Sequence, residues 1–184
     1  MIENWFSVPI WYFYDQNFGD DQEIKMIEFF NEYQKNDNAG QNRSNVNGYQ
    51  SGDISNSEPA QYIDSFLQKE VLPELVTCIN ITKVSINSMW FNENGPGGLN
   101  RNHVHPQTDL SGVFYVSTPE DCGNIVFYNP LTVSVMSRCN REENVHYTPE
   151  RGKFVIFPSW LYHSVRPNKG NGFRRSIAFN LTVS

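Results

Sequence analysis

The feature that most constrains the fold is a change of hydrophobic period at residue 81. From there to the end of the chain, apolar and polar residues alternate in short runs that Gly, Pro and Asn separate. Such alternation is typical of β-strands, whose successive side chains point to opposite faces. About seven or eight such strands, with no helix between them, predict a two-sheet β-sandwich or jelly roll. The runs are ITKVSINSMWF, HVHPQTDLSGVFYV, GNIVFYN, LTVSVMS, GKFVIFP, YHSVRP and RRSIAFNLTV.

The part of the chain before residue 81 has a helical period instead. Residues 20–35 begin with two aspartates that suit a helix N-terminus. The apolar face of this helix would consist of Ile24, Ile27 and Phe30, or alternatively of Met26 and Phe29. Residues 59–79 form a second helical segment, which Pro73 is expected to kink or restart. The polar, Asn-rich segment 36–57 between the two helices is expected to be a long surface loop.

These patterns predict a single domain over residues 1–184, of the α+β class but mainly β. A chain of 184 residues has room for one core and little more. The helical part would cover about residues 20–79 and the jelly-roll core about residues 81–183. We expect the N-terminal helices to pack on one face of the β part.

Charge and cysteine content exclude several classes of protein. The net charge is -6, and the longest basic cluster is Arg174-Arg175, so nucleic-acid binding through a basic face has no support. Three scattered cysteines, Cys78, Cys122 and Cys139, form no CxxC pair and fit a reduced cytoplasmic setting. We find no basic leader and no apolar run long enough for a membrane helix, so we expect a soluble, unexported protein.

Three histidines could hold a metal ion. His103 and His105 are two positions apart, and on a strand both imidazoles would project into the same space. His163, in the later segment FPSWLYHSVRP, is the third candidate. The remaining His146 stands in a loop-like segment without such a partner, and we expect it to play no part.

Asp109 is an alternative source of a ligand. It follows His105 by four residues, after a short turn, and would give the mixed nitrogen and oxygen ligand set that suits iron or manganese. It is also a residue type that commonly forms a turn before a strand. The residues alone leave both readings open.

The last predicted strand carries a candidate anion site. Alternation places Arg174, Ser176, Ala178 and Asn180 on one face, and Arg175, Ile177, Phe179 and Leu181 on the other. The second face is apolar, as a core face should be. The first is small and polar, and a guanidinium beside a hydroxyl suits a carboxylate, although an arginine at a solvated strand edge would give the same pattern.

Several segments together resemble one family. They are Trp90-Phe91-Asn92, residues 102–106 (NHVHP), residues 111–116 (SGVFYV) and residues 157–168 (FPSWLYHSVRPN). Jointly these segments resemble the Fe(II)/2-oxoglutarate-dependent oxygenases, and more narrowly the 2OG-Fe(II) oxygenase family with the pattern N-x-H-x-H-P, SGVxYV and FPSWLxH. The resemblance covers about residues 81–183.

This resemblance implies a double-stranded β-helix that holds one Fe(II) ion and 2-oxoglutarate. By position, His103 matches the first iron ligand and His163 the distal one. Arg174 with Ser176 matches the pair that binds the far carboxylate of 2-oxoglutarate, and Tyr115 matches a tyrosine that contacts the same carboxylate in several relatives. The chain departs from the wider superfamily at position 105, where His105 replaces the usual Asp or Glu. Either three histidines hold the iron, or Asp109 supplies the carboxylate.

The implied activity is hydroxylation of an unidentified small molecule or peptide, with release of succinate and CO₂. The segments 36–57 and 92–100 (NENGPGGLN) could be lids over that substrate. One alternative is a cupin-like protein with three metal-binding histidines that does not use 2-oxoglutarate, and Arg174 argues against it. Another is a metal-free structural or sugar-binding jelly roll, which Trp5, Trp11 and Tyr12 would favour if they are exposed.

Overall fold

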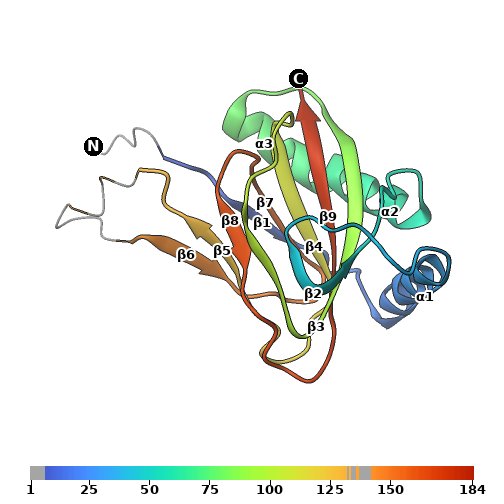
Figure 1. Cartoon of the computed structure of the whole chain (residues 1–184). Coiled ribbons are helices and arrows are strands. Elements are labelled where there is room, and N and C mark those ends of the chain that lie inside the picture. Colours follow the sequence, from blue (N-terminus) through green and yellow to red (C-terminus); the bar gives the residue numbers. More distant parts are fainter. Residues whose placement is uncertain (1–6, 132, 134–135, 137–141) are drawn as a thin grey trace.

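The computed structural model describes residues 7–131, 133, 136 and 142–184. In these residues nine strands form one curled antiparallel sheet, and three α-helices lie on its outside (Figure 1). In chain order the elements are β1 (Trp11–Tyr14), α1 (Asp20–Asn36), β2 (Asn45–Gln50), α2 (Glu58–Phe66), the π-helical turn η1 (Leu67–Val71), α3 (Leu72–Ile79), β3 (Val84–His103), β4 (Leu110–Ser117), β5 (Ile125–Tyr128), β6 (Asn144–Tyr147), β7 (Lys153–Pro158), β8 (His163–Val165) and β9 (Arg174–Val183).

The order of strands in the sheet is β1-β7-β4-β9-β3-β8-β5-β6, and β2 pairs with β3 as well. Because β3 is 20 residues long, it joins the two halves of the curled sheet: its first half pairs with β9 and its end pairs with β8. This arrangement confirms the predicted mainly β, jelly-roll type of architecture. Within the described residues, no helix is long and apolar enough to cross a membrane.

The outer face of the strands β3, β4, β7 and β9 forms the main core with the helices. Phe30 of α1 stacks on Phe91 of β3 with ring centroids 4.2 Å apart, and Phe66 of α2 stacks on Phe154 of β7 at the same distance. The predicted alternation of β9 is confirmed. Ile177, Phe179 and Leu181 belong to this core, whereas Arg174, Ser176, Ala178 and Asn180 line a cavity on the inner face.

Both predicted helices are present. Pro73 lies in the first turn of α3, directly after the π-helical turn η1 that connects α2 to α3. On α1 the buried residues are Met26 and Phe30, while Ile24 is 53% exposed. The buried face of α1 therefore matches neither predicted stripe completely and combines members of both.

Parts of two segments predicted to be loops are strands. Residues 45–50 of the segment 36–57 form β2, which pairs with the segment 92–100 inside β3. Residues 37–44 and 51–57 remain outside helices and strands, and within β3 the pairing register jumps from Leu99 to Asn94 around Gly97, which has a φ of 79°. These strands carry Asn, Gln and Ser because they face a cavity rather than an apolar core, so the hydrophobic period does not reveal them.

Two further strands were not predicted, and one predicted strand is not described. β1 covers part of the aromatic N-terminal segment, and β6 replaces the expected loop around His146. The predicted strand over residues 131–137 falls mostly outside the described residues. Cys139 and Trp5 also lie outside them, whereas Trp11 packs against the main core and Tyr12 is 56% exposed.

Replacement of Phe30 by alanine tests how the helices are attached to the sheet. Phe30 is fully buried, so Phe30→Ala should lower the free energy of unfolding by about 3–5 kcal/mol through lost burial and the cavity left behind. Ile24→Ala, on the exposed side of the same helix, should change it by less than about 0.5 kcal/mol. Urea denaturation of both variants measures the difference. Similar losses for the two variants would contradict the observed orientation of α1.

Candidate metal centre

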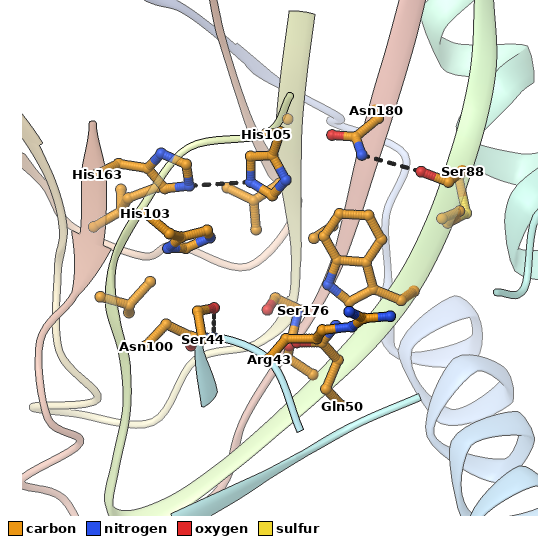
Figure 2. A pocket seen from close by; sticks show the side chains of 18 of the residues that line it. Arg43, Ser44, Gln50, Ser88, Asn100, His103, His105, His163, Ser176 and Asn180 are labelled. Carbon is orange, nitrogen blue, oxygen red and sulfur yellow. Dashed lines mark hydrogen bonds between the residues drawn. The ribbon is translucent and has the colours of Figure 1, made fainter. Parts of the chain in front are cut away.

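His103, His105 and His163 converge at one end of the inner cavity. One ring nitrogen of each lies within 4.8 Å of the corresponding nitrogens of the other two (Figure 2). His103 is the last residue of β3 and pairs directly with His163, the first residue of β8. His105 lies beyond the end of β3, so the expectation that it shares a strand with His103 is wrong. The bond from its backbone N–H to the Ser159 carbonyl, 2.9 Å long, holds this segment instead.

Backbone carbonyls orient two of the three imidazole rings. Nδ1 of His103 lies 2.7 Å from the Arg101 oxygen, and Nδ1 of His163 lies 2.9 Å from the Leu161 oxygen. A carbonyl only accepts, so each Nδ1 carries the proton and each Nε2 keeps its lone pair. Metal-binding histidines typically donate their other ring N–H to such a carbonyl, and this hydrogen bond fixes the orientation and the tautomer of the ring.

The three rings are also kept neutral, as metal ligands must be. Burial lowers the pKa of His163 to about 3 and that of His105 to about 4, and it lowers the pKa of His103 as well. The neighbouring imidazoles contribute in the same direction at His105 and His163. Nε2 of His105 and Nε2 of His163 are 3.3 Å apart. Two ligands bonded at about 2.1 Å and at right angles would lie roughly 3.0 Å apart, so the spacing suits one transition-metal ion.

The alternative ligand Asp109 and the remaining histidine, His146, lie away from the three converging rings. Asp109 is exposed, and its Oδ2 accepts a hydrogen bond of 2.9 Å from the backbone N–H of Val183. It is not among the grouped side chains. His146 is exposed on β6, where its Nε2 lies 2.6 Å from the Asn144 side-chain oxygen.

The histidines open onto a cavity of about 990 Å³ between the two halves of the sheet. Arg174 lies on its wall and is only 1% exposed. Its Nη1 donates to the backbone carbonyls of Cys122 and Gly123, which fixes the guanidinium, while Nη2 is buried without a hydrogen-bond partner. A buried N–H group without a partner is costly, and a carboxylate in the cavity would satisfy it.

Ser176 and Tyr115 lie opposite each other on β9 and β4, and both line the cavity. Burial raises the pKa of Tyr115, so its hydroxyl stays protonated and can donate to an anion. The structure thus brings the predicted residues Arg174, Ser176 and Tyr115 into the same cavity as the three histidines.

Several cavity residues received no role from the sequence. Asn92 faces Ser176 across the β3–β9 pair, is buried, and has a side-chain oxygen without a partner. Trp90 lies near His105, with ring centroids 5.6 Å apart. Both belong to the segment Trp90-Phe91-Asn92, but their place in the cavity depends on how β3 pairs with β9, which the alternation does not give. Gln50 of β2 could not be found either, because β2 itself was expected to be a loop.

Comparison with known proteins identifies the class of this site. The family model described as "Putative 2OG-Fe(II) oxygenase" matches residues 88–180. No curated protein sequence matches the chain. The chain therefore belongs to the 2OG-Fe(II) oxygenase family, a class of oxidoreductases, and its cofactors are Fe(II) and 2-oxoglutarate.

Solved structures share the fold at low sequence identity. HygX from Streptomyces hygroscopicus, with nickel, 2-oxoglutarate and hygromycin B bound, has a TM-score of 0.66 and 9% identity over 95% of this chain and 83% of its own. A prolyl-4-hydroxylase from Pseudomonas putida has a TM-score of 0.62 and 14% identity, covering 96% and 94%. A 2OG-Fe(II) oxygenase family oxidoreductase from Burkholderia pseudomallei has a TM-score of 0.53 and 15% identity; the match covers 67% of this chain and 57% of that one.

Proposed function

We propose that this protein is a dioxygenase that hydroxylates a small molecule with consumption of 2-oxoglutarate and O₂. The balanced reaction is R–H + 2-oxoglutarate + O₂ → R–OH + succinate + CO₂. The observation that carries the proposal is the presence of three neutral, converging imidazoles and one unpartnered guanidinium nitrogen in a single cavity. Bound Fe(II) would supply the activation of O₂, which side chains alone cannot perform.

In this proposal His103, His105 and His163 hold the iron. Arg174 binds the far carboxylate of 2-oxoglutarate with Nη2, while Nη1 stays fixed by the two backbone carbonyls. Tyr115 and Ser176 add hydroxyl donors from the facing strands β4 and β9. The chain's own residues thus position the cosubstrate between the cation and the guanidinium.

The proposal favours His105 over Asp109 as the third iron ligand. The carboxylate of Asp109 already accepts the Val183 N–H, whereas His105 faces the other two rings. We therefore expect His105→Ala to weaken Fe(II) binding by more than about tenfold and Asp109→Asn to leave it within about twofold. Anaerobic Fe(II) titration of both variants measures this. Loss of iron in the Asp109 variant alone would reverse the assignment.

Formation of succinate tests the activity itself. The purified protein, loaded with Fe(II) and 2-oxoglutarate without oxygen, should release succinate slowly once O₂ is admitted, even without a substrate to hydroxylate. The same sample kept without O₂, and a His103→Ala/His163→Ala variant with O₂, should release none. Succinate release that is independent of O₂ or of the histidines would refute the proposal.

A further inference from the structure

The cavity differs in charge from the rest of the chain. Among the residues that the structure describes, three Lys or Arg side chains line it, namely Arg43, Arg101 and Arg174, but only one Asp or Glu, Asp53. The carboxylate of Asp53 is already engaged, because it accepts the Met89 backbone N–H at 2.9 Å and the Ser55 hydroxyl at 2.6 Å. Arg43 and Arg101 are exposed at the cavity and Arg174 is buried in its wall, so a chain with a net charge of -6 carries a cationic cavity.

Arg43 and Arg101 are held beside each other by the backbone. The Arg101 N–H donates to the Ser44 carbonyl at 2.8 Å, and the Asn100 side-chain amide donates to the Ser44 hydroxyl at 3.1 Å. In Figure 2, Arg43 enters the pocket on the side of Gln50, away from His163. Neither guanidinium forms an ion pair with a carboxylate of the described residues. Both arginines are thus available to a ligand.

The cofactors of the proposed reaction do not use these two charges. Fe(II) and the 2-oxoglutarate dianion cancel each other, and Arg174 is the arginine assigned to that dianion. The remaining positive charges of Arg43 and Arg101 meet no free acid in the cavity. The volume of about 990 Å³ also leaves space for a second small molecule beside the cosubstrate.

We propose that Arg43 and Arg101 bind an anionic group, a carboxylate or a phosphate, on the small molecule that this protein hydroxylates. The inference rests on the proposed function, because it assigns the substrate class of the same cavity. The same cavity is also lined by the polar side chains of Gln50, Ser88, Asn92 and Asn180. A substrate held at the arginines by its anionic end would therefore be a polar molecule whose other end reaches toward the iron.

Benzoate and benzamide are matched probes for this inference, since they differ in charge but hardly in shape. Their affinities are measured by ligand-observed NMR titration of protein saturated with Fe(II) and 2-oxoglutarate without oxygen, so that Arg174 is already engaged. The wild-type protein should bind benzoate at least about tenfold more tightly than benzamide. An Arg43→Gln/Arg101→Gln variant should lose this preference. Phenyl phosphate, titrated in the same way, distinguishes the two anions: tighter binding than benzoate assigns the site to phosphate, and weaker binding to carboxylate.

A Lys25→Gln/Lys83→Gln variant is the control, because it removes the same charge from exposed lysines outside the cavity. It should keep the preference for benzoate. Equal affinity for benzoate and benzamide in the wild type, including no binding of either, would overturn the inference. A preference that persists in the arginine variant, or that disappears equally in the lysine variant, would also overturn it. A separate 2-oxoglutarate titration tests the proposed function. If 2-oxoglutarate does not bind, a benzoate preference that is measured with Fe(II) alone and is still lost in the Arg43/Arg101 variant would leave the anion site standing.

Discussion

A His103→Ala/His163→Ala variant should lose stoichiometric Fe(II). The two side chains come from paired positions at the ends of β3 and β8, and each has its Nδ1 bonded to a backbone carbonyl. Among the described residues, His105 is the one other potential ligand grouped with them. Changes to groups that only support a ligand typically weaken metal binding by 10- to 100-fold. Loss of two ligands should exceed this range, so we expect a decrease of more than about 100-fold, measured by anaerobic titration and metal analysis.

His146→Ala is the matched control for that variant. His146 is exposed on β6, and the structure groups it with none of the other histidines. Its removal should leave the iron content unchanged. Unchanged iron in the double variant, or loss of iron in the His146 variant, would show that the ligand set is misassigned.

The second large effect concerns Arg174. If its Nη2 binds the far carboxylate, Arg174→Gln leaves a desolvated anion without its charged partner. The expected cost is about 2–5 kcal/mol, or roughly 30- to 4000-fold in the affinity for 2-oxoglutarate. Titration of 2-oxoglutarate into the Fe(II) protein without oxygen measures this value.

Arg175→Gln controls for the loss of a positive charge on the same strand. Arg175 points to the opposite face of β9, and its Nε donates to Glu93 at 2.6 Å. The variant should bind 2-oxoglutarate within about twofold of the wild type. Equal losses in the Arg174 and Arg175 variants would show that the effect does not arise from contact with the cosubstrate.

The sequence predicts the parts of this protein in which one face of an element is apolar. The alternation in β9 separates Arg174 and Ser176 from Ile177 and Phe179, and the structure places the two sets as expected. The period of α1 predicts a helix, but its buried face is set by contact with Phe91 of β3, a residue far away in the chain. Local spacing therefore could not show that Ile24 is exposed.

The polar half of the cavity could not be predicted in this way. The segments around Gln50 and Asn92 pair as β2 and β3, yet both carry amides where a core strand would carry valine or isoleucine. Their stability comes from backbone pairing and from Tyr49, which packs against Phe91 with ring centroids 5.3 Å apart. The position of His105 could not be predicted for the same reason. It lies outside any strand, and a hydrogen bond from its backbone N–H to the Ser159 carbonyl holds it in place.

Anomalous diffraction at the iron edge, from crystals grown without oxygen with Fe(II) and 2-oxoglutarate, tests the central claim most directly. We predict one iron peak at bonding distance from Nε2 of His103, His105 and His163. Density for 2-oxoglutarate should extend from that peak to the Nη2 atom of Arg174. An iron peak away from the three imidazoles, or 2-oxoglutarate bound without contact to Arg174, would contradict the account.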